Sequence, residues 1–229
     1  IGLIGGSAVP KPGEISLAHR GVLFLDEFPE FPRLVLEAMR QPMEDGFVVV
    51  SRARERVIFP ARFMLIAALN PCPCGYFGDK KHACSCAPAQ ILRYQKRVSG
   101  PILDRIDIHI DVPAVEVEKI TSDESDNRES SAIVRKRIIL ARKKQYARLV
   151  GKRAIANSDM SSRDIKELVL LSDEAKQILK QATTTLSLSA RSYHKVIKVA
   201  QTISDLEGKK EVGKEHILEA LQYRAKSTL

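Results

Sequence analysis

At 229 residues, the chain is long enough for one large domain or two small domains with hydrophobic cores of their own. Its residues are 44% hydrophobic and 28% charged, as in ordinary globular proteins. No apolar run approaches the roughly 20 residues that a membrane-crossing helix needs, and the N-terminus lacks the basic start and apolar stretch of a signal peptide. Composition therefore argues against a membrane protein.

The formal net charge of +9 is concentrated in the second half. Residues 1–126 carry 15 Lys and Arg against 17 Asp and Glu, a net charge of −2, whereas residues 127–229 carry 22 against 11, a net charge of +11. The polar stretch at 121–128 separates the halves, and we expect a domain boundary near Asn127. A basic domain favours a polyanionic partner, with nucleic acid the first candidate. A basic helical surface that only faces solvent is the alternative.

The first half predicts a largely parallel α/β sheet, because its short apolar runs alternate with Pro and Gly turns. In chain order, the predicted elements are a strand at 22–25 covered on both faces, a short helix at 33–40, a hairpin at 47–50 and 57–59, a strand at 63–69 and a partly alternating strand at 108–112.

The second half predicts an all-helical bundle. Ser161 with Asp164 three residues later, and Ser189, are typical of helix starts. Apolar residues recur at helical spacing at 196, 199, 203 and 206, and again at 217, 218 and 221.

Residues 135–153 contain nine Lys or Arg and no acid. An apolar stripe of Val134, Ile138, Tyr146 and Leu149 predicts an amphipathic helix here. We expect its basic side to face solvent, and a contact with DNA or a neighbouring subunit is the alternative.

Two carboxylates directly follow the first predicted strand. Asp26 and Glu27 end the run GVLFLDE, and Asn70 follows the strand at 63–69 in the same way. Open α/β sheets bind ligands at the carboxyl ends of their strands. In phosphoryl transfer such an Asp typically holds hydrated Mg²⁺ and the Glu orients the attacking water. The alternatives are solvated acids at a strand end and an Asn that caps a turn before Pro71.

Three passages resemble one known family. Residues 12–28 (PGEISLAHRGVLFLDEF) are similar to the approach to the Walker B strand in magnesium-chelatase-like AAA+ ATPases. Residues 61–75 (ARFMLIAALNPCPCG) and 99–107 (SGPILDRID) resemble a narrower group, the competence-related ComM/YifB proteins, relatives of the MCM replicative helicases. The resemblance covers essentially the whole chain. It implies an α/β fold of the AAA+ type, with part of the core at 1–126 and a helical lid domain at 127–229.

The resemblance also implies roles for matching residues. Asp26 and Glu27 would be the Walker B pair, with Asp26 as the Mg²⁺ ligand, and Asn70 would be sensor 1. Arg105 would be an arginine finger that reaches a neighbouring subunit's ATP, and Arg191, in SARS at 189–192, would be sensor 2. A guanidinium can stabilise charge on a transferring phosphoryl group. From the residues alone, a salt bridge from Arg105 to Asp104 or Asp107 is the alternative.

No G-x-x-x-x-G-K-[ST] phosphate-binding loop occurs in the 229 residues. Because the sequence also begins without Met, we expect the chain to be part of a longer protein whose phosphate loop lies upstream of Ile1. We predict that this chain alone neither binds ATP tightly nor hydrolyses it. Stoichiometric ATP binding in calorimetry would contradict that prediction.

Four cysteines lie within fifteen positions and nowhere else: Cys72, Cys74, Cys84 and Cys86. In a cytoplasmic protein, which we expect here, such grouping favours a metal site over a disulfide framework. Two thiolate pairs could close a tetrahedral zinc site. Reduced thiols in a loop, or two disulfides, are the alternatives.

The tip of the predicted hairpin, SRARER at 51–56, is a candidate DNA contact. Arg52 and Arg54 would touch backbone phosphates without sequence preference. Lys11 could belong to a second element that faces the central DNA channel of the helicase-like ring that the resemblance implies. An exposed basic turn that keeps the chain soluble is the alternative.

The leading hypothesis is an ATP-driven motor that acts on DNA, assembled as a hexameric ring, with helicase or branch-migration activity in recombination. This hypothesis follows from the resemblance. A chelatase-type motor that inserts metal into a tetrapyrrole is the second hypothesis, and a non-catalytic, zinc-stabilised nucleic-acid-binding module is the third. The basic hairpin and basic second half argue against the chelatase, whose partner is a protein rather than a polyanion.

Overall fold

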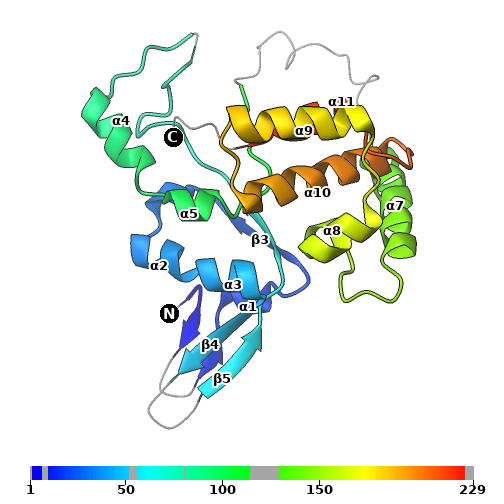
Figure 1. Ribbon diagram of the computed structural model, residues 1–229. Coiled ribbons are helices and arrows are strands. Elements are labelled where there is room, and N and C mark those ends of the chain that lie inside the picture. The colour runs from blue at the N-terminus through cyan, green and yellow to red at the C-terminus, as the bar shows by residue number, and fades with distance from the viewer. Residues whose placement is uncertain (1, 7–9, 52–55, 80, 114–128, 225–229) are drawn as a thin grey trace. The chain divides into compact units, whose positions relative to one another are not determined.

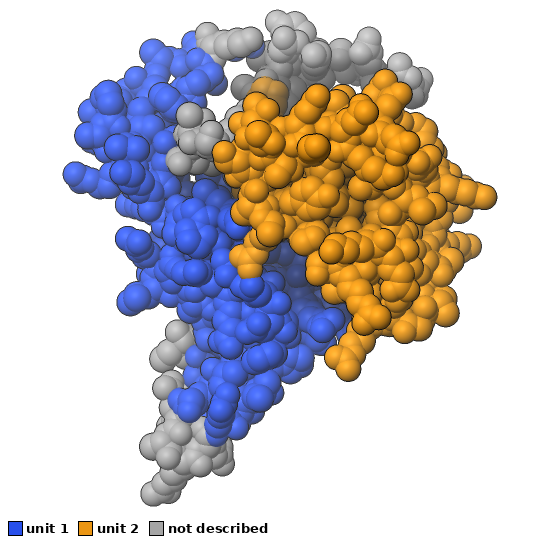
Figure 2. All heavy atoms as spheres, in the orientation of Figure 1, with its two compact units in different colours: residues 1–106, 225–229 blue, residues 107–224 orange. Residues whose placement is uncertain are grey.

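The computed structural model describes residues 2–6, 10–51, 56–79, 81–113 and 129–224 (Figure 1). Clustering of contacts divides the chain into two compact units, one within residues 1–106 and the other within residues 107–224 (Figure 2). The expected domain boundary near Asn127 lies outside the described residues.

Unit 1 combines three small sheets with short helices. Its elements are β1 (Gly5–Gly6), β2 (Lys11–Pro12), α1 (Glu14–Leu17), β3 (Val22–Leu25), the 3₁₀ helix η1 (Phe28–Glu30), α2 (Arg33–Ala38), α3 (Arg40–Asp45), β4 (Phe47–Ser51), β5 (Arg56–Pro60), β6 (Met64–Ala67), α4 (Pro88–Gln95) and α5 (Gly100–Leu103). Its core contains Ile15, Leu23, Leu25, Phe28, Leu36, Met39, Val48, Val50 and Ile102.

The predicted hairpin and the predicted helix at 33–40 both have counterparts. β4 and β5 pair antiparallel from Phe47 opposite Pro60 to Ser51 opposite Arg56. The helix is divided into α2 and α3, which meet at Met39. Gly46 ends α3 with a φ of +74°, a backbone angle that favours glycine and turns the chain into β4.

The parallel sheet is present as the pair β3 and β6. Along β3, exposed and buried side chains alternate, with Leu23 and Leu25 in the core and Val22 and Phe24 exposed. The expectation that this strand is covered on both faces is therefore wrong for the described residues. One face packs on the core of unit 1, and an uninterrupted apolar run alone does not show that the other is covered.

The third predicted strand, at 108–112, is wrong. These residues are described, but they form no strand. Ile110 and Val112 are mostly exposed, and the His109 N–H donates to the Tyr223 carbonyl at 2.8 Å. Because a strand requires a neighbouring ladder of N–H and C=O groups, the alternating pattern could not form one here.

Unit 2 is all helical among its described residues, as the sequence predicts. It contains α7 (Ser131–Arg148), the 3₁₀ helix η3 (Asn157–Asp159), α8 (Ser162–Leu168), α9 (Asp173–Thr185), α10 (Ala190–Leu206) and α11 (Lys214–Gln222) (Figure 1). The core between them includes Leu149, Met160, Ile165, Leu179, Val196, Ile197, Ala200, Val212 and Ile217. None of the helices described in either unit has the length and apolarity needed to span a bilayer.

The basic helix exists as α7, and its predicted apolar stripe is correct in part, since Leu149 lies in the core and Val134 is partly buried. Ile138 and Tyr146 are about half exposed, whereas Ala141, Gln145 and Leu149 are buried. These buried residues lie four positions apart and so share one helix face. On this face, Gln145 accepts from the Asn157 N–H at 3.3 Å, and the neighbouring Arg148 pairs with Asp205 of α10.

The start of α8 makes a reciprocal capping arrangement. The Asp164 N–H donates to Ser161 Oγ at 3.1 Å, while Asp164 Oδ2 accepts from the Ser161 hydroxyl at 2.6 Å and the Ser161 N–H at 2.9 Å. The hydrogen bond from the Ser161 hydroxyl is the main cause that lowers the pKa of Asp164, and the hydrogen bond from the Ser161 N–H is the second cause. This is the capping box that the sequence predicts.

Ser161→Ala is expected to destabilise unit 2 by about 1 kcal/mol, the usual contribution of a helix N-cap. The pKa of Asp164 should rise towards its ordinary value. A carboxyl group whose pKa is lower in the folded chain than in the unfolded chain stabilises the fold at pH values above its unfolded-state pKa. This stabilisation disappears as the pH falls through the folded-state pKa. The stability difference between the wild type and the variant should therefore shrink below about pH 4. Urea unfolding at several pH values measures it, and a difference that grows with acidity would contradict the assignment.

Candidate functional site

The two strands that carry the candidate residues lie side by side. β3 and β6 run parallel, with Leu25 opposite Ala67. The pairing continues past the strands, since the Ala68 N–H donates to the Leu25 carbonyl and the Phe28 N–H donates to the Ala68 carbonyl, both at 2.9 Å. The predicted adjacency of these two segments is confirmed.

This pairing sets the positions of Asp26, Glu27 and Asn70. The two acids directly follow β3, Asn70 comes three residues after β6, and all three are exposed. Because the strands are parallel, both of their carboxyl ends lie at one sheet edge. The convergence of the three side chains at that edge stays a prediction.

Glu27 has an unusual backbone conformation that sequence reasoning missed. Its φ of 49° and ψ of 44° lie in the left-handed region, which costs a non-glycine residue on the order of 1–3 kcal/mol. Asp26 Oδ1 accepts from the Glu27 N–H at 2.8 Å, and the chain then enters η1, where Phe28 and Pro29 are buried. Burial of that turn holds the strained residue, and strain of this kind often accompanies functional sites.

Arg105 follows α5 and is largely enclosed, with only 14% of its side chain exposed. Its Nη2 lies 2.5 Å from Glu44 Oε2, and its Nη1 donates to the Pro101 carbonyl at 2.7 Å. Nε is buried without a hydrogen-bond partner. The sequence suggested an adjacent Asp as an alternative partner and missed Glu44, which lies 61 positions away and carries no sequence signal.

Arg191 lies in unit 2, near the start of α10. Ser189 caps that helix, its Oγ accepting from the Ser192 N–H at 3.1 Å. This confirms the predicted helix start and shows which turn of α10 carries Arg191.

The candidate DNA contacts are only partly described. Arg52 and Arg54 lie outside the described residues, between strands that end at Ser51 and begin at Arg56. Lys11 is exposed in β2, which pairs with β1. A Cβ on Gly13 would lie only 2.3 Å from the Gly5 nitrogen, so this crossing requires glycine.

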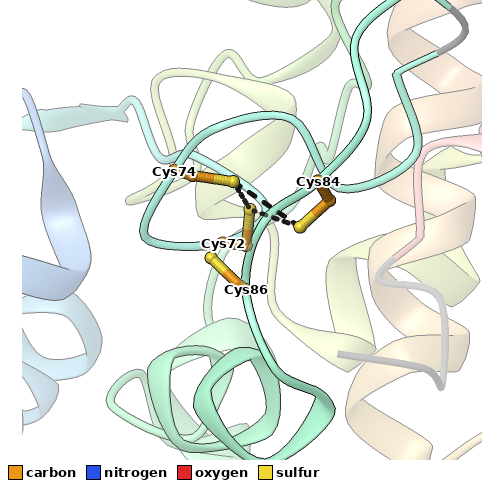
Figure 3. Close-up of side chains that lie close together, drawn as sticks. All are labelled: Cys72, Cys74, Cys84 and Cys86. Atoms are coloured by element: carbon orange, nitrogen blue, oxygen red, sulfur yellow. Dashed lines mark hydrogen bonds between the residues drawn. The ribbon is translucent and has the colours of Figure 1, made fainter.

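The four cysteines converge (Figure 3). Their Sγ atoms all lie within 4.8 Å of one another, with Cys72–Cys74 at 3.4 Å, Cys74–Cys84 at 3.5 Å and Cys72–Cys84 at 3.7 Å. A disulfide would require about 2.05 Å, and all four are free thiols. Cys72 is buried, and the other three are partly exposed.

Backbone groups surround these thiols and separate their pKa values. A backbone hydrogen bond from Tyr76 is the main cause that lowers the pKa of Cys74, to about 5. For Cys84, the backbone N–H of Cys86 acts to lower the pKa, but desolvation and the neighbouring thiols outweigh it and raise the pKa to about 12. One thiolate thus forms readily, and its charge opposes ionisation of the next unless a cation is present.

Comparisons with known proteins agree with this picture. The family described as "Magnesium chelatase, subunit ChlI" matches residues 1–120, and "Magnesium chelatase, subunit ChlI C-terminal" matches residues 128–224. The chain is 46% identical to Competence protein ComM of Haemophilus influenzae and 41% identical to YifB of Escherichia coli, in each case over 97% of its length. A DNA replication licensing factor, mcm-6 of Caenorhabditis briggsae, is 22% identical over 96% of the chain and 26% of its own length.

A mixed α/β unit with a parallel strand pair and a helical second unit, matched in this way, places the chain among AAA+-like proteins. Within that class, it belongs to the magnesium chelatase ChlI family. It is similar to ComM and YifB along nearly its whole length, but it spans only 42% of ComM and 43% of YifB.

Proposed function

We propose that this chain is part of an ATP-hydrolysing motor that acts on DNA in the cytoplasm, with helicase or branch-migration activity. The observation that carries the proposal is the parallel pairing of β3 with β6, the two strands that Asp26, Glu27 and Asn70 follow in the sequence. ATP and Mg²⁺ are the cofactors that such an edge would serve. The similarity to ComM, and more distantly to an MCM protein, favours DNA as the partner.

At this edge, each side chain has a distinct task. Asp26 would hold hydrated Mg²⁺, which suits a carboxylate oxygen. Glu27 would accept a proton from the attacking water, and the Asn70 amide would orient that water or the γ-phosphate. The left-handed turn at Glu27 sets the direction of its side chain independently of any ligand.

Arg105 and Arg191 would complete the site from elsewhere. In the proposed hexameric ring, Arg105 reaches the ATP of a neighbouring subunit, and Arg191 contacts the nucleotide from the lid. Arg105 would first have to exchange Glu44 for phosphate, since its guanidinium pairs with that carboxylate in the chain alone. The exchange is reasonable because a triphosphate offers more negative charge than one half-exposed carboxylate.

Arg52, Arg54 and Lys11 would contact the DNA backbone.

The decisive experiment measures ATP hydrolysis by the complete protein that contains this chain, with and without DNA. Stimulation by DNA is expected, whereas an ATPase indifferent to DNA would favour the metal-insertion alternative. Absence of any ATPase activity would favour a non-catalytic binding module.

Replacing Arg52 and Arg54 together by Ala is expected to weaken DNA binding and to flatten its salt dependence. Each lost phosphate contact should reduce the slope of log affinity against log salt by about 1. Fluorescence anisotropy at several salt concentrations measures the slope. The matched control replaces Arg163 and Lys166, two exposed cations of α8, and should leave the slope unchanged. Equal slopes for the hairpin variant and the wild type would contradict the contact.

A further inference from the structure

The segment between β6 and α4 lacks the features that normally hold a loop in place. Within its described residues, 71–79 and 81–87, there is no helix or strand, and Cys72 is the only buried residue. Tyr76 and Phe77 are 44% and 49% exposed. A structureless segment of this length is uncommon in a compact domain, and one with so little apolar burial needs another source of order.

We propose that Cys72, Cys74, Cys84 and Cys86 bind one Zn²⁺ ion in a closed four-thiolate site that orders this segment. A tetrahedral ion with Zn–S bonds of about 2.3 Å separates its sulfurs by about 3.8 Å. The three Sγ–Sγ distances among Cys72, Cys74 and Cys84, 3.4 to 3.7 Å, lie close to that value. The sulfurs of Cys72, Cys74 and Cys84 meet between the two arms of the loop, and the sulfur of Cys86 lies beside them (Figure 3), with all four within 4.8 Å of one another.

The chemistry of the site selects zinc and a structural role. Four soft thiolates favour Zn²⁺ over Mg²⁺ or Ca²⁺, which prefer oxygen ligands. Four protein ligands leave no open position for a substrate or water, as in structural rather than catalytic zinc sites. The Phe77 N–H donates to Cys72 Sγ at 3.3 Å, the kind of second contact that orients a ligand.

His82 lies within the loop but outside the ligand set. Its side chain is 63% exposed, and its ring lies 5.0 Å from the Tyr76 ring. It therefore provides a control residue of the same loop that can coordinate metal in principle and is not placed to do so here.

The ion would connect two parts of unit 1. Cys72 and Cys74 follow the end of β6, whereas Cys84 and Cys86 immediately precede α4, which begins at Pro88. Gln95 of α4 also donates to the Pro71 carbonyl at 3.1 Å. Since Asn70 is two residues before Cys72, zinc would also fix the backbone beside Asn70. This last step rests on the proposed function, whereas zinc binding does not.

The test uses this 229-residue chain, purified without chelators. Zinc content by plasma mass spectrometry is expected to equal one ion per chain, with the four thiols protected from a thiol reagent until the zinc is chelated. Cys84→Ser combined with Cys86→Ser should lose the zinc, and His82→Ala should retain it. A reconstitution with Co²⁺ should give the intense visible bands of a tetrahedral thiolate site, which distinguishes four sulfur ligands from a mixed set.

Absence of zinc together with four freely reacting thiols would overturn the proposal, and so would two disulfides or a site filled by iron. Should the double serine variant fail to fold, chelation of the wild type still decides the question. Hydrogen exchange should then accelerate at 71–87 while the helices of unit 2 stay protected. None of these measurements uses nucleotide. The zinc proposal can therefore be confirmed while the proposed motor function is contradicted, and the motor function can be confirmed while the zinc proposal is contradicted.

Discussion

Glu27→Gln in the complete protein is expected to reduce ATP hydrolysis by about 10²- to 10⁴-fold, the usual contribution of a general base. The amide has the same shape as the carboxylate but cannot take a proton from the attacking water. ATP affinity should change little, because Asp26, rather than Glu27, is the proposed Mg²⁺ ligand. The turn should also survive, since the left-handed backbone is held by the burial of Phe28 and Pro29. Phosphate release at saturating ATP and calorimetric ATP binding measure the two quantities.

Glu14→Gln is the matched control for this variant. Glu14 is an exposed carboxylate of unit 1, on α1 and away from the strand end, so its loss removes the same charge without touching the proposed site. Its hydrolysis rate should equal that of the wild type. An undiminished rate in Glu27→Gln would remove Glu27 from the mechanism. An equal loss of binding and hydrolysis would indicate a structural role instead.

Features of the fold with a local cause could be predicted from the sequence. Apolar runs before Asp26 and Asn70 predicted the paired strands, because short apolar runs between turns are typical of strands that pack on a core. The caps Ser161 and Ser189 predicted two helix starts, since side-chain oxygens there satisfy backbone N–H groups that have no partner inside the helix. The clustering of the cysteines was also visible, because their spacing brings the two ends of one loop together.

Features that depend on distant partners could not be predicted. The strand expected around Ile110 fails because alternation of side chains does not supply a neighbouring strand. Glu44 lies in α3 and Arg105 follows α5, 61 positions later, so no local pattern marks this ion pair. Likewise, the left-handed turn at Glu27 depends on the burial of the residues after it.

The buried face of α7 has a similar explanation, centred on Asp205. Both of its oxygens are satisfied: Oδ2 accepts from Arg148 Nη1 and Asn157 Nδ2, each at 2.9 Å, and Oδ1 accepts from Arg148 Nη2 at 2.5 Å and Gln201 Nε2 at 3.2 Å. Arg148 lies three residues after Gln145, at the C-terminal end of α7, so this bidentate contact holds that end of the helix to α10. Ile138 lies seven residues before Gln145 on the same helix face, towards the N-terminal end, where it is half exposed. A charged residue that looked solvent-facing in the sequence thus anchors one end of the helix.

Asp205→Ala is expected to destabilise unit 2 by about 3–5 kcal/mol, the usual cost of removing one partner of a buried ion pair. The Asp205 side chain is fully buried and that of Arg148 is 16% exposed, so the variant leaves an enclosed guanidinium without its carboxylate. The amide of Asn157, which is 1% exposed, also loses an acceptor. Urea unfolding followed by helical circular dichroism measures the loss, and hydrogen exchange in α10 assigns it to unit 2.

Lys176→Ala provides the matched control, because it also breaks a single ion pair within a helix of unit 2. Lys176 lies 2.8 Å from Asp173, but their side chains are 60% and 93% exposed, and such surface pairs contribute about 0–1 kcal/mol. The control therefore removes one exposed ion pair inside α9, whereas Asp205→Ala removes a buried ion pair between α7 and α10 and the hydrogen bonds to Asn157 and Gln201. Equal losses in both would show that the Asp205 network does not hold α7 to α10. Combining Asp205→Leu with Arg148→Met should recover much of the stability, since the double change leaves no buried charge unpaired.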